Sequence, residues 1–292
     1  MKIFEIIDGE SSLLMGVLMY YEKEKSYIIE LPEGLDEWNA PLLFTSFVRR
    51  RIYTIPKDIS FLWVQERVIP SGRQNISDIL NKHHLQFYDE MKFLEISQGK
   101  CSQDSLYIKQ TDSLPDFVLK RQTHNIRESV FLENYEVLCF FLDDTIRKIS
   151  LKKLCMKSGL SAPSNLDEID LSEKLENIEN IDVCDDLNKI TNNEMLYRTG
   201  KVGTGGYSIT FNNTIDIPAW VLYNAGIKID LRLKDFIAFV QNNTLDTAEC
   251  CDILECSRQN ISYMVRQHQL TPTKKEVRGN LYLKGNVLGN LW

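Results

Sequence analysis

The sequence predicts an α+β protein with several domains, in which two small domains of antiparallel sheets and helices precede a small C-terminal helical module. Apolar runs separated by polar turns predict strands at residues 3–7, 12–21 and 26–31. Apolar residues at helical spacing predict helices directly afterwards, at residues 42–48 and 59–68. The total of 292 residues fits two or three domains with hydrophobic cores of their own.

The first domain is predicted to span residues 1–115. It continues with a third helix at residues 74–84, which Pro70-Ser71-Gly72 separates from the helix before it. Mixed strand and helix signals then lead to a Pro-containing break just before residue 116. Residues 116–229 and 230–292 follow as the second and third domains.

The second domain is predicted to contain two β-hairpins. Strands on both sides of Asp143-Asp144 form the first, and a second at residues 207–218 has Asn212-Asn213 at its tip, followed by a helix at residues 220–225. Between the hairpins, residues 161–186 carry nine acidic residues against a single Lys, with apolar residues at helical spacing. This segment is either a surface amphipathic helix or a partly ordered insert.

Composition excludes an integral membrane protein and a disulfide-stapled secreted protein. Hydrophobic residues make up 43% of the chain, but no apolar run approaches the roughly 18 residues of a membrane span. A secretory signal has a basic segment before its apolar stretch, and the N-terminus of this chain has none. The seven cysteines are scattered without a CxxC pair, which favours free thiols in a reducing compartment. We therefore expect a cytoplasmic protein.

Charge is distributed unevenly along the chain. The formal net charge is −7, yet from Ser257 onward six Lys and Arg residues face only Glu276, a local charge of +5. Because cationic side chains attract the phosphates of nucleic acids, this end is the expected place for a nucleic-acid contact.

Residues 245–270 predict two short helices joined by a tight turn. Asp246 with Glu249 three residues later forms a capping box, Leu245 can pack on Cys250, and Ser257 can cap the second helix. Apolar residues at the spacing that closes a small core are Cys251, Leu254, Cys256, Ile261, Met264 and Val265. The pattern predicts an all-α or winged helix-turn-helix module, and the alternative is a helical hairpin that only packs or dimerises.

The polar face of the second helix supplies the candidate DNA-binding residues. Side chains that can hydrogen-bond to base edges or phosphates are Ser257, Arg258, Gln259, Ser262, Tyr263 and Arg266. After Thr271-Pro272, a two-stranded wing turning at Gly279-Asn280 is expected to place Lys274, Lys275 and Arg278 near phosphates. Packing of small apolar side chains explains Cys250, Cys251 and Cys256 better than a metal site, whose cysteines usually stand two to four residues apart.

This stretch resembles the helix-turn-helix of excisionase and MerR-type bacterial regulators over about 45 residues. The resemblance rests on small residues at Cys250 and Cys251 and on the opening Ser257-Arg258. It departs where Glu255 stands at the turn position usually held by Gly, and where His268 stands at a helix end that Gly or Asn would ease. It implies DNA binding.

The hairpin blocks at residues 134–154 and 206–226 resemble the two halves of a small bacterial domain of unknown function, the 2442 family. Here the acidic insert separates the halves, and Phe211 stands where the family pattern has tryptophan. The resemblance implies an α+β accessory domain for binding a partner or effector, and it supplies no catalytic residues.

The pentapeptide RQNIS occurs twice, at residues 73–77 and 258–262. Either the first copy marks a second, degenerate helix-turn-helix in the first domain, or it belongs to an ordinary packed helix and the identity is a coincidence.

No motif predicts an active site. The four histidines stand outside HExxH and related metal patterns, and Gly203-Thr204-Gly205-Gly206 lacks the Lys and Ser or Thr of a phosphate loop. We therefore expect no enzyme, no cofactor and no metal.

The function that the sequence favours is regulation of transcription. We expect the protein to bind double-stranded DNA as a homodimer, because one short recognition helix covers only a half-site. The alternative is an antitoxin-like or adaptor protein whose residues 1–229 bind a partner protein. No contact with a membrane is expected.

Overall fold

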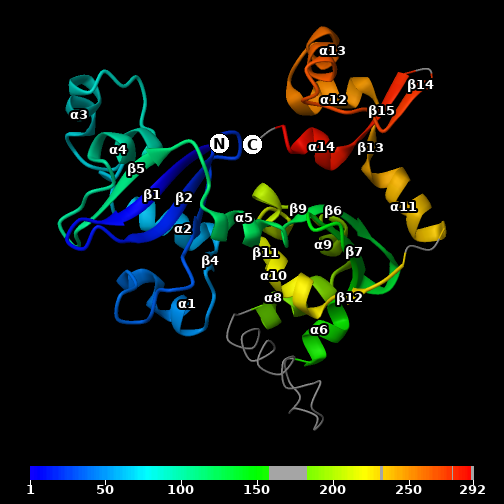
Figure 1. Cartoon of the computed structure of the whole chain (residues 1–292), viewed down its shortest axis with the longest axis horizontal. Helices are drawn as coiled ribbons and strands as arrows, with labels where there is room; N and C mark the ends of the chain where they lie inside the picture. Colours follow the sequence, from blue (N-terminus) through cyan, green and yellow to red (C-terminus); the bar gives the residue numbers. More distant parts are fainter. Residues whose placement is uncertain (158–182, 231–232, 278, 291–292) are drawn as a thin grey trace. The chain divides into compact units, whose positions relative to one another are not determined.

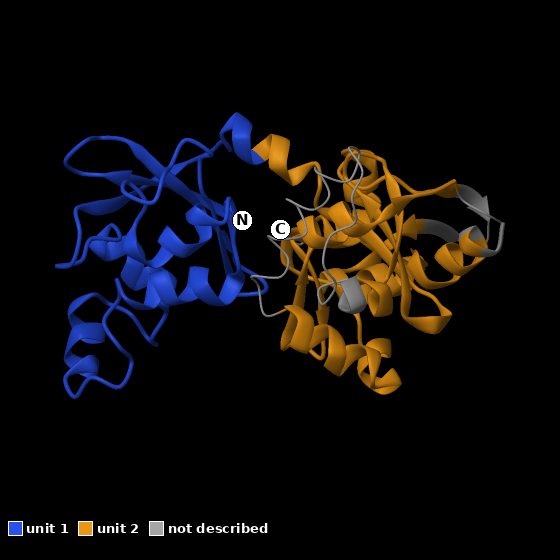
Figure 2. Cartoon of the chain, turned by 90° about the horizontal axis from the view of Figure 1, so that it is seen from below, with its two compact units in different colours: residues 1–118 blue, residues 119–292 orange. Residues whose placement is uncertain are grey.

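The computed structural model describes residues 1–157, 183–230, 233–277 and 279–290. The chain forms two compact units, Met1–Val118 and Leu119–Trp292 (Figure 1; Figure 2). Both units combine helices with antiparallel sheets, so the predicted α+β class is confirmed. The division into three domains stays a prediction. Within the described residues, every helix is too short or too polar to cross a membrane.

The first unit is built on a five-stranded antiparallel sheet with the strand order β4-β3-β2-β1-β5. Its strands are β1 (Lys2–Asp8), β2 (Leu14–Tyr21), β3 (Ser26–Glu30), β4 (Thr54–Ile55) and β5 (Leu106–Thr111). The first three form the predicted meander, with Met19 opposite both Ile3 and Ile28. The chain later returns along the other edge of β1, where Ile108 lies opposite Ile6. Strand β2 is central and is therefore buried on both faces.

Short helices accompany the sheet of the first unit, and several of them complete its hydrophobic core. They are η1 (Leu42–Phe44), α1 (Thr45–Arg49), α2 (Lys57–Gln65), α3 (Ile76–Lys82), α4 (Glu90–Ser97) and α5 (Asp116–Gln122), the last of which continues into the second unit. Phe44, Trp63 and Leu94 are buried in one cluster with Ile29 of the sheet. Helix α3 buries none of its residues.

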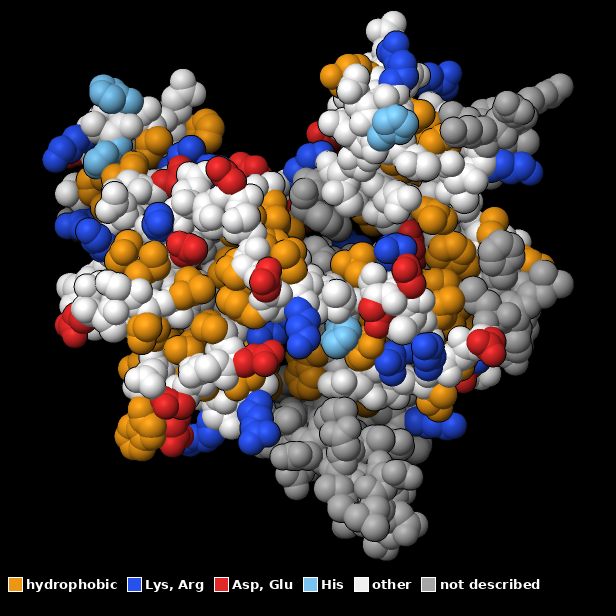
Figure 3. Space-filling model, in the orientation of Figure 1, with side chains coloured by type: hydrophobic (Ala, Val, Ile, Leu, Met, Phe, Trp, Pro, Cys, Tyr) orange, Lys and Arg blue, Asp and Glu red, His pale blue; other side chains and the backbone are white. Residues whose placement is uncertain are grey.

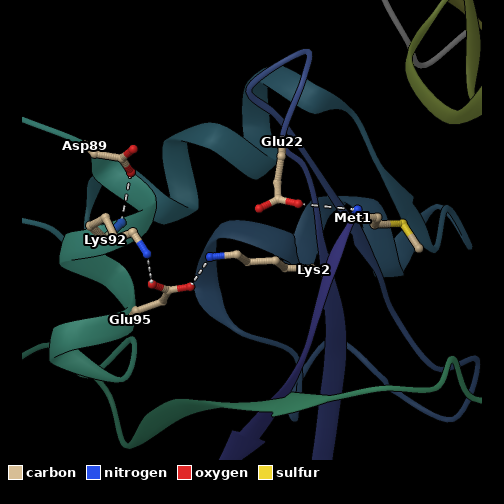
Figure 4. Close-up of polar contacts among 6 residues, drawn as sticks. All are labelled: Met1, Lys2, Glu22, Asp89, Lys92 and Glu95. Atoms are coloured by element: carbon tan, nitrogen blue, oxygen red, sulfur yellow. Dashed lines mark hydrogen bonds and ion pairs between the residues drawn. The ribbon is translucent and has the colours of Figure 1, made fainter. Parts of the chain in front are cut away.

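Polar contacts fasten α4 to the start of β1 (Figure 4). Glu95 lies between two lysines, with Lys2 Nζ 2.5 Å from its Oε1 and Lys92 Nζ 3.2 Å from its Oε2. Asp89 caps the helix by accepting from the Lys92 N–H at 2.9 Å. Burial alone would raise the pKa of Glu95, but hydrogen bonds from both lysines hold the pKa below its ordinary value. The carboxylate therefore stays charged at neutral pH and joins helix to sheet.

The described residues of the second unit form three antiparallel sheets, with strand orders β12-β8-β7-β6, β11-β10-β9 and β13-β15-β14. The strands of the first two are β6 (Ile126–Phe131), β7 (Glu136–Phe141), β8 (Ile146–Ser150), β9 (Lys201–Val202), β10 (Ser208–Phe211), β11 (Ile215–Pro218) and β12 (Ile227–Lys228). Both predicted hairpins are present, as β7–β8 and β10–β11. Asn212 and Asn213 have φ of 49° and 60°, as a type I′ turn requires.

The two hairpins share one hydrophobic core. Phe141 of β7 and Ile149 of β8 belong to the same buried cluster as Phe211 of β10 and Ile217 of β11. The helices of this region are η2 (Glu133–Tyr135), α6 (Leu151–Lys157), α8 (Val183–Thr191), α9 (Glu194–Arg198), η3 (Thr204–Gly206) and α10 (Ala219–Ala225). Of the acidic segment predicted at residues 161–186, residues 161–182 lie outside the described residues.

The last part of the chain forms four helices and the third sheet. Its elements are α11 (Leu233–Asn243), β13 (Thr244–Leu245), α12 (Thr247–Leu254), α13 (Arg258–Arg266), β14 (Lys274–Val277), β15 (Gly279–Leu283) and α14 (Lys284–Leu288). Helix α11 contacts the four-stranded sheet, with the ring centroids of Phe239 and Phe140 4.4 Å apart.

A buried carboxylate connects α14 to β6. Glu128 is 3% exposed, and its Oε1 accepts a hydrogen bond from the Gly285 N–H. A Cβ on residue 285 would overlap this carboxylate and the carbonyl oxygen of Arg127, so only glycine fits the contact. Burial raises the pKa of Glu128 to about 7, although the Gly285 N–H and the charges of Lys284 and Arg127 act to lower it.

The raised pKa of Glu128 predicts that the protein loses stability as the pH rises. Between the ordinary value of 4.5 and about 7 the folded state holds more protons than the unfolded state, so the free energy of unfolding falls across that window. We expect Glu128→Gln, which keeps an acceptor without the charge, to match the parent near pH 5 and to exceed it by roughly 1–3 kcal/mol at pH 8. Thermal unfolding at both pH values measures the difference, and parallel pH profiles would contradict it.

Candidate nucleic-acid interface

Helix α12 begins at the predicted capping box. The Asp246 carboxylate accepts from the N–H groups of Ala248 at 2.7 Å and Glu249 at 2.9 Å. In return Glu249 Oε2 accepts from the Asp246 N–H at 2.8 Å. Leu245 and Cys250 lie in the same buried cluster, as the predicted contact across this cap requires. The start of the helix is therefore fixed by its own sequence.

The turn after α12 is a Schellman motif closed by a residue other than glycine. Glu255 has φ of 51°, in the left-handed region, and the Cys256 N–H donates to the Cys251 carbonyl at 3.0 Å. Glu255 is exposed, so its side chain lies in solvent and not in the core. The unfavourable part is its left-handed backbone conformation. The departure from the helix-turn-helix pattern at this position therefore does not prevent the tight turn.

Helix α13 starts one residue after the turn and packs against α12. Ser257 Oγ caps it by accepting from the Asn260 N–H at 3.3 Å, as predicted. Ile261 is 1% exposed and meets Leu254 in a cluster. The other buried members of that cluster are Leu245, Cys250, Leu270, Tyr282 and Val287, with Cys251, Ile253, Cys256, Met264 and Val265 partly buried against it.

The opposite side of α13 is polar and open to solvent. The exposed side chains are those predicted for the site, namely Ser257, Arg258, Gln259, Ser262, Tyr263 and Arg266. Tyr263 leaves 51% of its surface exposed, which is unusual for a large aromatic residue. Among the residues that the structure describes, neither Arg258 nor Arg266 has an acidic side chain within ion-pair distance. Figure 3 shows Lys and Arg side chains gathered over this end of the chain.

Two of these polar side chains also bond to their own helix. Ser262 Oγ donates to the Arg258 carbonyl at 3.0 Å, and Arg266 Nε donates weakly to the Ser262 carbonyl at 3.4 Å. The terminal nitrogens of Arg266 remain available for an external acceptor, and the Ser262 hydroxyl oxygen can still accept.

Helix α13 ends in the same way as α12. His268 has φ of 58°, and the Gln269 N–H donates to the Met264 carbonyl at 2.9 Å, so a second non-glycine residue closes a Schellman motif. Asn290 then holds this end, because its Nδ2 donates to the Gln269 carbonyl at 3.2 Å. Both ends of α13 are therefore fixed by hydrogen bonds.

A hairpin follows α13, but Gly279-Asn280 does not form its turn, contrary to the prediction from the sequence. Val277 of β14 lies opposite Gly279 of β15, so Gly279-Asn280 belongs to a strand and not to the turn. Lys274 is exposed at the start of β14, and Lys275 lies in the same strand. Arg278 lies outside the described residues. Strand β13 pairs with β15 and was not predicted, because a strand of two residues leaves no pattern.

Asn260 is a candidate contact that the sequence reasoning missed. Its side chain is exposed in the first turn of α13, beside Gln259. An amide can bind adenine through two hydrogen bonds in the major groove. The signal in the sequence that could have identified Asn260 is its position in the helix, between Gln259 and the buried Ile261.

The first copy of the RQNIS pentapeptide has a different structure from the second. Helix α3 begins only at Ile76, after Arg73 and Gln74, and none of its residues is buried. Ile76 is only partly buried where its counterpart Ile261 is 1% exposed. Helix α3 therefore lacks the buried side of α13, and the second helix-turn-helix considered for residues 59–84 stays a prediction.

No protein family, no curated protein and no solved structure matches this chain. The resemblances to excisionase and MerR-type regulators and to the 2442 family therefore stay predictions, and the properties of the site rest on the geometry of its own residues.

The left-handed backbone conformations of Glu255 and His268 predict that glycine at either position stabilises the protein. Glycine adopts such a conformation without a Cβ clash, so Glu255→Gly and His268→Gly should each raise the free energy of unfolding by about 1 kcal/mol. Gln267→Gly is the matched control, because Gln267 has φ of −84° and gains no relief there. Thermal unfolding of the three variants measures the effect, and equal destabilisation by all three would contradict it.

Proposed function

We propose that this protein is a sequence-specific DNA-binding regulator of transcription, with α12, α13 and the β14–β15 hairpin acting as a winged helix-turn-helix. The observation that carries the proposal is the polar face of α13. Beneath that face Ile261 is buried, and above it two arginines, amide side chains and a tyrosine face solvent. A short helix with this arrangement fits the major groove of B-form DNA.

The local chemistry supports a division of labour among these residues. Arg258 and Gln259 stand in the first turn of α13, the part of a recognition helix that contacts base edges. Arginine pairs well with guanine, and glutamine with adenine. Lys274 and Lys275 lie on the hairpin, where phosphate contact contributes affinity without sequence preference.

A homodimer is part of the proposal. Helix α13 has nine residues and can contact only a few base pairs. Two copies reading half-sites one helical turn apart would recognise an operator with twofold symmetry. The partners that we propose are therefore double-stranded DNA and a second copy of the chain.

Loss of the two arginines should abolish specific DNA binding. Fragments of the source genome bound by the parent at moderate salt would first identify the site, and fluorescence anisotropy would then measure affinity for it. We expect Arg258→Ala to cost about 1–3 kcal/mol, roughly a 5- to 150-fold weaker affinity, and Arg266→Ala to weaken it further. Lys274→Ala should instead reduce the salt dependence by about one phosphate contact.

Arg198→Ala is the matched control for charge. Arg198 is also exposed at the end of a helix, but it pairs with Glu194 far along the sequence from α13. This variant should bind like the parent. If the Arg258→Ala/Arg266→Ala double variant retains parental affinity, α13 is not the recognition helix.

The adaptor function remains the second candidate because Trp38 and Leu42 are the most exposed large apolar side chains of the first unit. Trp38 is 86% exposed, and Leu42 at the start of η1 is 94% exposed. Isolated aromatic anchors of this kind are common in protein interfaces. A partner protein that co-purifies with the parent and is lost on Trp38→Ser with Leu42→Ser, while DNA is not bound, would favour this function.

A further inference from the structure

The turn between α12 and α13 brings two cysteines together. In a Schellman motif the residue two beyond the helix end donates to the carbonyl five positions earlier, and a contact between the side chains of these two residues is frequent. Here those residues are Cys256 and Cys251, joined by the 3.0 Å hydrogen bond between their backbones. Both thiols are free, partly exposed and packed against the same small core.

The electrostatics of Cys251 agree with the closeness of the two residues. After burial, the nearby Cys256 thiol is the strongest influence that raises the pKa of Cys251, while the charge of Arg258 lowers it. Cys250 differs from both, because it is fully buried and its pKa is raised to about 12. Cys250 therefore stays a protonated core residue, whereas the thiols of Cys251 and Cys256 are both partly exposed to solvent.

We propose that Cys251 and Cys256 are a dithiol that is oxidised reversibly to an intrachain disulfide across the turn. A disulfide needs Cα atoms about 4.4–6.8 Å apart, and the backbone hydrogen bond between Cys256 and Cys251 holds these two residues close to each other. The bond would tie the last turn of α12 to the residue before Ser257, the cap of α13. The dithiol is a property of the turn itself and does not depend on DNA binding.

The oxidant that we name is a small disulfide such as oxidised glutathione. The Cys256 thiolate attacks one of its sulfur atoms, which forms a mixed disulfide and releases one glutathione thiolate. The Cys251 thiolate then attacks the Cys256 sulfur and displaces the second glutathione. In total the protein loses two protons and two electrons, and one oxidised glutathione becomes two reduced molecules.

Peptide mapping of the full chain tests the proposal. The protein is incubated with oxidised glutathione, remaining thiols are alkylated, and the chain is cleaved after glutamate. Cleavage at Glu249 and Glu255 separates Cys250 and Cys251 from Cys256. We expect the two peptides to remain linked until dithiothreitol is added, and Cys101 and Cys184 to be alkylated normally.

Single variants assign the bond to its residues. Cys250→Ala should leave the linked pair in place, whereas Cys251→Ser should halt the reaction with glutathione attached to Cys256, because the second thiol is missing. If the parent itself accumulates glutathione on Cys256 without linkage, or if the linked pair persists in Cys251→Ser, the proposal is wrong. The readout is a mass, so it holds even where a variant lowers stability.

Discussion

The left-handed backbone at Glu255 is the constraint on which the candidate site depends. Helix α12 must end and α13 must begin within three residues, since Leu254 and Ile261 are buried in the same small cluster. A non-glycine residue in this conformation costs about 1–2 kcal/mol. The capping box, the Ser257 cap and the burial of Ile261 offset that cost. Because α13 is fixed at both ends, its polar face is presented without rearrangement.

In the second unit, a single core unites segments that are far apart in the sequence. The two hairpins come from opposite sides of the acidic segment, yet Phe141 and Phe211 share one cluster, and β12 adds to the edge of β8. The link from this core to the last helix passes through Glu128, whose carboxylate has one backbone donor and little solvent. Ionising such a group is unfavourable, which explains its raised pKa.

Local signals in the sequence predicted local structure well. The hairpin turn at Asn212-Asn213, the capping box at Asp246 and the cap at Ser257 are all present, because each depends on residues within a few positions. Contacts that depend on distant residues were not predictable. The pairing of β5 with β1 and the burial of Glu128 under α14 left no periodic or compositional trace. The exposed face of α13 was predicted because its helical spacing fixes which side chains share a side.

The contact between Glu128 and Gly285 restricts the two positions unequally. Residue 285 tolerates no Cβ, since the backbone carbonyl of Arg127 closes the space, whereas residue 128 needs only an acceptor and can be Glu or Gln. Any distant relative that keeps this packing must therefore carry glycine at one position and an acceptor at the other, two positions that are 157 residues apart in this chain. This long-range pair offers a diagnostic signature for relatives whose overall sequence similarity has decayed.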